Sequence, residues 1–276
     1  MAEIKSADVA KLRKMTGAGM MDCKKALQEA DGDFDKATEI IRKKGQAVAS
    51  KRAEREASEG VVLAKASGDH TKGFMIVLNC ETDFVAKNDD FVKFAESILD
   101  LALEKQPANL HELKSLTLGG ETVADAVTEQ IGIIGEKLDL SFYDMIDSTQ
   151  VTAYVHPGNK LASMIGLNKA IPDEQVGKDV AMQVAAMSPI AVDKDDVPQD
   201  VQDREIEIGK DQARREGKPE QILERIAMGK LNKFFKENTL LNQDFVKDHK
   251  RTIKQYLQEK DKDLTVTGFV RFGLNN

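Results

Sequence analysis

The side chains that could perform acid–base or metal chemistry are scattered along the chain. Acidic pairs occur at Asp89–Asp90 and Asp195–Asp196, and His70 and His111 fall in loop or helix positions with no evident partner. A zinc site needs Cys and His at short fixed spacings, and phosphate, protease and dinucleotide sites have motifs of their own; none of these is present. The acidic pairs are better explained as helix caps and solvated turns. The sequence therefore predicts no catalytic residue, no metal site, no cofactor and no enzyme.

A polar stretch at residues 79–90 (NCETDFVAKNDD) combines an aromatic ring with carboxylates. It follows an apolar run that ends at Leu78 and precedes a helical pattern that begins at Phe91, so we expect a strand-to-helix junction whose side chains lie on a rim. Phe84 has two interpretations there. On the residues alone, the ring is most simply explained as a cap on the local core. The alternative is a wedge for another protein, since a ring buried in a partner's pocket contributes about 1.5–3 kcal/mol.

Two blocks resemble the signatures of the bacterial translation elongation factor Ts family. TDFVAKN begins at Thr82, after a strand that ends in NCE, and TGAGMMDCKKAL at residues 16–27 is similar to the family's amino-terminal signature. The blocks occur in the family's order near the start of the chain, and the resemblance runs over nearly the whole length. It implies a nucleotide-exchange factor for the GTPase elongation factor Tu, which displaces Mg²⁺ and promotes GDP release. The alternatives are a scaffold or chaperone-like binding module and a small hydrolase of unrecognised type.

The resemblance also assigns roles to individual residues. The segment that displaces Mg²⁺ from the partner would consist of Thr82, Asp83, Phe84 and Val85. Within it, Phe84 would be the wedge and Asp83 would contact polar groups beside it. The matching positions for contact with the partner's GTP-binding domain are Arg13, Met20 and Met21, and His156 would lie at a second contact.

Composition and charge favour a protein partner over a nucleic acid. The net charge of the 276 residues is −7, whereas nucleic-acid binders carry basic footprints. Cys23 and Cys80 form no CxxC motif, which predicts buried free thiols in a reducing compartment. Residues 1–5 contain no apolar leader, and no apolar run is long enough to span a membrane. We therefore expect a cytoplasmic protein that contacts neither membrane nor nucleic acid directly.

Residues 1–55 predict a three-helix bundle, similar to ubiquitin-associated (UBA) domains, and a linker. Ser6 is expected to cap a first helix with Val9, Leu12 and Met15 on one face, and Gly45 is a candidate end for the third helix. Met20 and Met21 cannot both point inward, because neighbours on a helix diverge by about 100°. Residues 43–59 have few large apolar side chains and predict a solvated helix or linker.

The remainder predicts an α+β fold with an internal repeat. The order strand, turn, strand, helix occurs twice, so we expect two similar antiparallel-sheet-plus-helix subdomains at 56–140 and 141–276. The helix of the second repeat has Val176, Val180, Val184 and Met187 as its apolar stripe.

A charged insertion at about 190–237 predicts an antiparallel helical hairpin. Helices at about 199–215 and 219–237 flank the turn Glu216-Gly217-Lys218-Pro219. A homodimer through this hairpin is one use for it, and a solvated arm is the other. The sequence stops at Gly273-Leu274-Asn275-Asn276, where many relatives continue into a further helix that touches the partner; that contact is expected to be absent or replaced.

Overall fold

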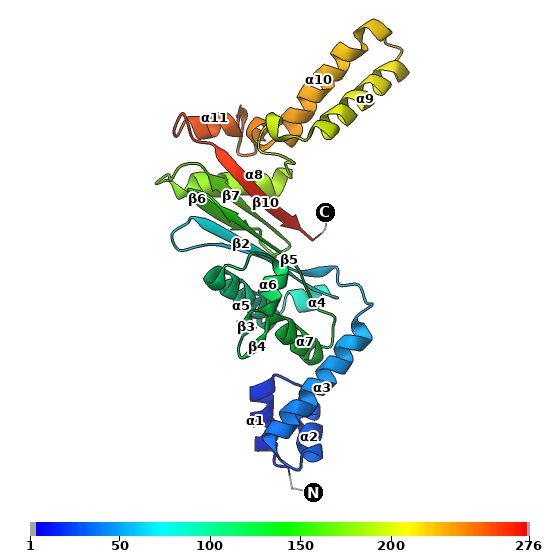
Figure 1. Cartoon of the computed structure of the whole chain (residues 1–276), viewed down its shortest axis with the longest axis vertical. Helices are drawn as coiled ribbons and strands as arrows, with labels where there is room; N and C mark the ends of the chain where they lie inside the picture. The colour runs from blue at the N-terminus through cyan, green and yellow to red at the C-terminus, as the bar shows by residue number, and fades with distance from the viewer. Residues whose placement is uncertain (1–3, 275–276) are drawn as a thin grey trace.

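A computed structural model describes residues 4–274 and has an elongated α+β architecture (Figure 1). A small helical bundle lies at one end, two antiparallel sheets form the middle, and a helical hairpin projects from the other end. Residues 1–3, part of the segment expected to contain no leader, lie outside the described residues. The chain end at Asn275–Asn276 also lies outside them. Within residues 4–274, no helix combines the length and apolar character needed to cross a bilayer.

The bundle consists of α1 (Ser6–Thr16), α2 (Met20–Glu29) and α3 (Phe34–Arg52). Ser6 was expected to cap α1, but it is the first helical residue and Lys5 occupies the cap position. Asp8 contributes to the difference, because its carboxylate accepts the Lys5 N–H at 3.3 Å, one of the N–H groups left free at the helix start. Met15 was expected on the buried face and is instead exposed, whereas Thr16 is buried. The bundle core contains Val9, Leu12, Ala18, Cys23, Ala26, Leu27, Ala30, Ala37 and Ile41.

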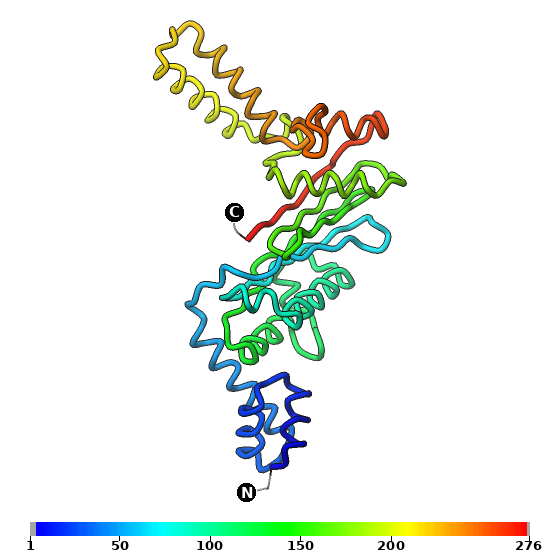
Figure 2. The backbone as a smooth tube through the Cα atoms, turned by 180° about the vertical axis from the view of Figure 1, so that it is seen from behind, coloured from blue at the N-terminus to red at the C-terminus, as the bar shows by residue number. Residues whose placement is uncertain are grey.

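The third helix is longer than the sequence predicted. Gly45 does not end it; the helix continues to Arg52 and carries the chain from the bundle to the sheets (Figure 2). Gly45 is buried because it packs against Gly132 of α7 (Val123–Ile134). The glycine is therefore a contact point between helices.

The first sheet has the order β1-β2-β5 and is antiparallel throughout. Its strands are β1 (Glu59–Ala66), β2 (Lys72–Cys80) and β5 (Asp139–Asp147). The predicted division between residues 140 and 141 falls inside β5, which pairs with β2 along its length. One face packs on α5 (Asp89–Lys105), α6 (Leu110–Ser115) and α7, with the small β3–β4 hairpin (Thr117–Leu118 and Glu121–Thr122) between α6 and α7.

The second sheet repeats this topology. Its order is β6-β7-β10, so the second strand of the hairpin is again central and a later strand joins its free side. The strands are β6 (Gln150–Val155), β7 (Leu161–Leu167) and β10 (Val266–Gly273), and α8 (Glu174–Met187) packs on one face. Met187, expected in the apolar stripe of α8, is exposed at the helix end.

The two sheets share an apolar layer. Val62, Ala64, Met75 and Val77 of the first sheet form one cluster with Ala162 and Met164 of the second. Each sheet is thus covered by helices on one face and by the other sheet on the opposite face, which explains why β1 and β2 read as nearly continuous apolar runs. The two sheets therefore pack against each other through this layer, while each has a further apolar cluster beneath its own helices.

The projecting hairpin consists of α9 (Gln199–Arg215) and α10 (Glu220–Asn238), close to the bounds expected from the sequence. Small residues let the helices approach: a Cβ on Gly209 would lie 3.1 Å from the Cα of Ala227. The chain then returns through β8 (Asp244–Phe245), β9 (Asp248–Thr252) and α11 (Ile253–Gln258), whose apolar residues join the core of the second sheet.

Candidate functional site

Phe84 lies on a one-turn helix, α4 (Asp83–Ala86), directly after the end of β2. Thr82 caps this turn, with its Oγ1 accepting the Val85 N–H at 3.5 Å. Ala86 is buried and Val85 packs partly against the core, which directs Phe84 outward. The Phe84 side chain is 83% exposed, the highest value among the exposed large hydrophobic residues that the structure describes. The interpretation of Phe84 as a core cap is therefore wrong.

Asp83 is a charged neighbour of the exposed ring. The Lys87 Nζ donates to Asp83 Oδ2 at 2.6 Å across one helical turn, and this hydrogen bond is the main reason that the pKa of Asp83 is below its usual value. Lys160, in the turn between β6 and β7, also contributes to the lowering of this pKa. The site thus offers an ionised carboxylate beside an aromatic ring.

Cys80 and Glu81, the two residues that precede Thr82, anchor the turn to the core. The Cys80 thiol is buried and donates to the Thr82 carbonyl at 3.1 Å; burial raises its pKa to about 12, so it is a structural thiol. Glu81 accepts the Lys137 N–H at 2.6 Å and pairs with Arg52 at 2.7 Å. The Lys137 hydrogen bond and the arginine charges hold the pKa of Glu81 below its usual value.

Glu136 is a residue of this site that the sequence analysis missed. Its Oε1 accepts the Thr82 hydroxyl at 2.7 Å, and its Oε2 accepts the Thr82 N–H at 3.0 Å. Glu136 is 54 residues from Thr82 in the chain, and the sequence shows it only as a polar residue after a helix-ending glycine. No local signal could have found it.

The bundle presents Arg13, Met20 and Met21 at its surface. Both methionines are exposed, by 44% and 63%, and Arg13 is exposed near the end of α1. The α1–α2 loop contacts the core, because a Cβ on Gly17 would lie 3.3 Å from Ile133 of α7. Ile133 also lines a crevice of about 320 Å³ with Val85. The bundle and the turn that carries Phe84 therefore border the same helix.

His156 is exposed and lies directly after β6, at the start of the turn to β7. The Tyr154 hydroxyl and His156 Nδ1 are 2.8 Å apart. Lys160 of the same turn pairs with Glu59 at 2.7 Å, and Glu59 pairs with Cys80 in the sheet register. The structure thus places the His156 turn near the end of β2, from which the Phe84 turn begins.

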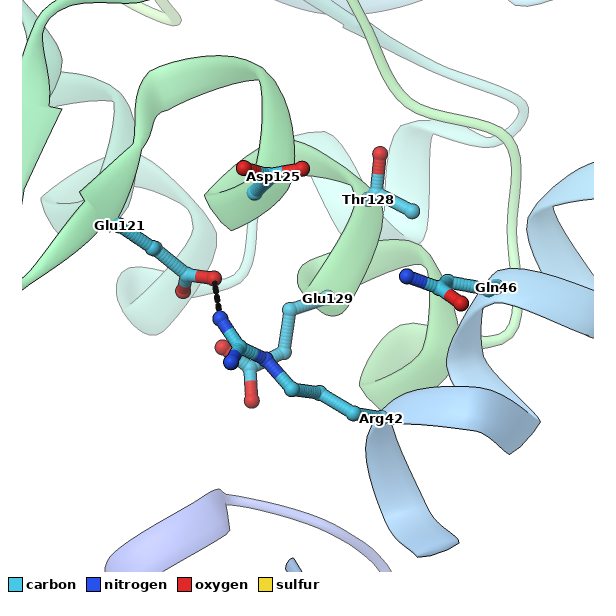
Figure 3. Close-up of a pocket in the computed structure, with 6 residues that line it drawn as sticks. All are labelled: Arg42, Gln46, Glu121, Asp125, Thr128 and Glu129. Carbon is cyan, nitrogen blue, oxygen red and sulfur yellow. Dashed lines mark hydrogen bonds and ion pairs between the residues drawn. The ribbon is translucent and has the colours of Figure 1, made fainter. Parts of the chain in front are cut away.

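A polar cavity of about 240 Å³ lies between α3 and α7 (Figure 3). Arg42 of α3 extends toward Glu121 and Glu129 and forms an ion pair with Glu121. Burial, together with a hydrogen bond to Glu121, raises the pKa of Glu129 to about 7. No group of three or more His, Cys, Asp or Glu side chains that could hold a metal ion occurs in the described part of the chain. This cluster belongs to the junction between bundle and core.

Comparison with known proteins decides the family. A family model described as "Elongation factor TS" matches residues 81–276. "Elongation factor Ts" of Porphyromonas gingivalis is 54% identical over 271 residues, covering 97% of each chain. The chain belongs to the elongation factor Ts family. Proteins of the same name from Christiangramia forsetii and Chloroherpeton thalassium are 50% and 47% identical, over 99% and 98% of this chain and 100% and 96% of theirs. Membership of this elongation factor Ts family supports a role in translation elongation.

Proposed function

We propose that this chain is the guanine-nucleotide exchange factor for elongation factor Tu. It binds the GDP-bound GTPase, displaces Mg²⁺ and promotes GDP release so that GTP can bind. The observation that supports this most directly is the exposure of Phe84, 83%, on a capped turn in a chain of this family. An unpartnered aromatic ring is costly in water and enters a protein pocket favourably.

The chemistry of exchange needs no reactive group on this chain. Mg²⁺ neutralises the nucleotide phosphates in GTPases, so any shift of its ligands weakens nucleotide binding. Phe84 would press on the partner beside this metal, while Asp83 contacts neighbouring polar groups and Thr82 and Val85 hold the turn. Coupling between binding sites is reciprocal, so GDP weakens the factor's binding as much as the factor weakens GDP binding. The factor therefore turns over without covalent chemistry.

Two further contacts would hold the partner during exchange. Arg13, Met20 and Met21 on the bundle would bind the GTP-binding domain, since exposed methionines suit adaptable protein surfaces. His156 would bind a second domain from the turn of the second sheet. We further propose that the bundle is of the ubiquitin-associated type and that the protein acts in the cytoplasm, without direct contact to nucleic acid or membrane.

The helical hairpin has a separate proposed use. Ile208 of α9 and Met228 of α10 are each 42% exposed, which would suit self-association. We propose a homodimer through α9 and α10. Sedimentation of the full chain over a range of concentrations tests this, and a monomer at every concentration would leave the hairpin as a solvated arm.

The proposed exchange activity is tested by release of fluorescent GDP from purified elongation factor Tu, with and without this chain. Stimulation at substoichiometric amounts supports exchange. The alternative function is a non-catalytic scaffold or chaperone-like module. The exposed methionines of the bundle are also consistent with that function, because it too needs a protein-binding surface. That alternative predicts a complex with an unchanged rate of GDP release.

A further inference from the structure

We propose that Glu136 is a positioning residue for exchange: its carboxylate holds the turn that carries Phe84 in the orientation that acts on the partner. This inference rests on the proposed exchange function. It adds a residue that lies outside the TDFV segment and does not itself touch the partner.

Both oxygens of Glu136 are engaged with Thr82. One accepts the Thr82 hydroxyl at 2.7 Å and the other accepts its backbone N–H at 3.0 Å. Thr82 is the N-cap of α4, so these two bonds fix the residue from which the turn begins. A hydrogen bond to an ionised carboxylate is stronger than one between neutral groups, and two such bonds restrain orientation as well as distance.

The residue after Glu136 completes the restraint. The Lys137 N–H donates to the Glu81 carboxylate at 2.6 Å. Glu136 therefore contacts Thr82, and its neighbour Lys137 contacts Glu81, the neighbour of Thr82. Glu81 in turn binds Arg52, the last residue of α3. We call the contacts of Glu136 and Lys137 with residues 81 and 82 the carboxylate clamp.

The clamp is fixed to the core on its other side. Gly135 ends α7 in a left-handed conformation with φ +80°, which turns the chain toward the clamp. Leu138 and Leu140 follow and are buried, at 4% and 1% exposure. Because its own backbone is held by a helix end and a core strand, Glu136 can restrain the otherwise short and solvent-exposed α4.

Loss of the clamp should therefore act on the rate of exchange more than on complex formation. A misplacement of about 1 Å in a catalytic group can cost up to about 100-fold in rate. For Glu136→Leu, which keeps the size but has no acceptor, we expect the maximal rate of GDP release to fall roughly tenfold, with the half-saturating concentration nearly unchanged. A role in general stability would instead lower the amount of active protein and leave the rate per folded molecule intact.

Glu136→Gln is the conservative variant. Its amide oxygen can accept the Thr82 N–H, and its amide nitrogen can donate to the Thr82 hydroxyl oxygen, so we expect a rate within about twofold of the parent. Glu112→Leu is the matched control, because Glu112 of α6 also accepts a backbone N–H, that of Ala108 at 2.7 Å, and is not part of the clamp. If Glu136→Leu does not fold, Glu136→Asp replaces it in the test of the clamp. Aspartate keeps the charge but is one methylene too short to hold both groups of Thr82, so the maximal rate of GDP release should again fall.

A double-mutant cycle with Phe84→Ala distinguishes the two proposals. If Glu136 acts through the ring, Glu136→Leu slows release from the parent but has no further effect in the Phe84→Ala background. If Phe84→Ala slows release and a folded Glu136→Leu matches the parent, or if the two effects multiply in full, the clamp proposal is overturned and the exchange function stands. If Phe84→Ala itself matches the parent, the wedge function fails.

Discussion

Gly132 of α7 faces Gly45 of α3 so closely that a Cβ on Gly132 would lie 2.4 Å from the Cα of Gly45. Position 132 therefore requires a residue without a Cβ, whereas a Cβ on Gly45 would lie 3.5 Å from the Cα of Gly132, an ordinary contact distance. Arg42, one turn before Gly45, pairs with Glu121 beside the same contact. The direction in which α3 leaves the core, and hence the place of the bundle relative to Phe84, depends on this crossing (Figure 2).

Gly132→Ala is expected to destabilise the protein, although alanine is the better helix former. Overpacking at a tight contact costs about 1–3 kcal/mol, whereas the helix-propensity gain is about 1 kcal/mol. The control is Gly229→Ala in α10, where no atom lies within 4 Å of the new Cβ and the propensity gain should appear alone. Urea denaturation measures both. If Gly132→Ala and Gly229→Ala raised the free energy of unfolding by the same amount, the close contact between α3 and α7 would not constrain the structure.

Glu129 predicts a pH dependence of stability. Its folded pKa is about 7 and its ordinary value 4.5, so between these values the folded protein holds a proton that the unfolded chain has released. Stability should therefore fall as pH rises from about 4.5 to 7. Glu129→Gln removes this dependence and should be more stable than the parent at pH 8 by about 1 kcal/mol, with allowance for solvent screening.

The comparison with Glu39→Gln, in α3, separates this effect from the general effect of removing one carboxylate from the protein. Glu39 is exposed and its pKa is lowered by its bond to Lys43, so that variant should gain nothing at pH 8. Thermal denaturation at pH 4.5 and pH 8 tests both variants. A stability difference between Glu129→Gln and the parent that is the same at both pH values contradicts the assignment.

We expect two amide substitutions at His156 to differ in their effect on the affinity for elongation factor Tu. If the Tyr154 hydroxyl donates to Nδ1, the neutral ring carries its hydrogen on Nε2 and presents a donor to the partner. The amide nitrogen of Gln replaces Nε2, whereas that of Asn replaces Nδ1. We expect His156→Gln to keep its affinity for elongation factor Tu within about twofold and His156→Asn to lose roughly fivefold, the value of one hydrogen bond. Equal losses in the two variants would exclude an outward N–H donor.

Met21 should contribute to binding and not to the chemical effect on the nucleotide. The side chain is 63% exposed on the bundle, and its burial by a partner is worth on the order of 1–2 kcal/mol. Met21→Ala should therefore raise the half-saturating concentration by about tenfold and leave the maximal release rate unchanged. Met187→Ala is the control, because Met187 is also exposed, at 44%, and lies at the end of α8. A lower maximal rate for Met21→Ala would instead link the bundle directly to the wedge.

Local patterns predicted most of the elements of this fold. The alternation of strand, turn and helix predicted both β-hairpins and the helices that follow them, and the Glu216–Pro219 turn predicted the α9–α10 hairpin. Some of the failures come from contacts between distant residues, and others, such as the cap of α1, from local geometry. Gly45, for example, resembles a helix end until Gly132 is known to face it.

The site was predicted in part for the same reason. The TDFV segment was found through resemblance, but the residues alone favoured a buried Phe84, because nothing local shows that Ala86 takes the inward position and leaves the ring 83% exposed. Glu136 could not be found at all, since its role depends on Thr82, which lies 54 residues away. The exposed residues of the candidate site were thus identified only through resemblance, and the residue that holds their turn in place was not identified from the sequence.

The most direct test of the central claim is the rate of GDP release from elongation factor Tu stimulated by Phe84→Ala, measured with Mg²⁺ present and again after chelation. Ile190→Ala is the control, because Ile190 is also exposed, at 51%, but lies in the second half of the chain. We expect Phe84→Ala to fold normally and to slow release at least tenfold with Mg²⁺, and the difference from the parent to shrink once Mg²⁺ is removed. A folded Phe84→Ala variant that matches the parent in the presence of Mg²⁺ would contradict the account.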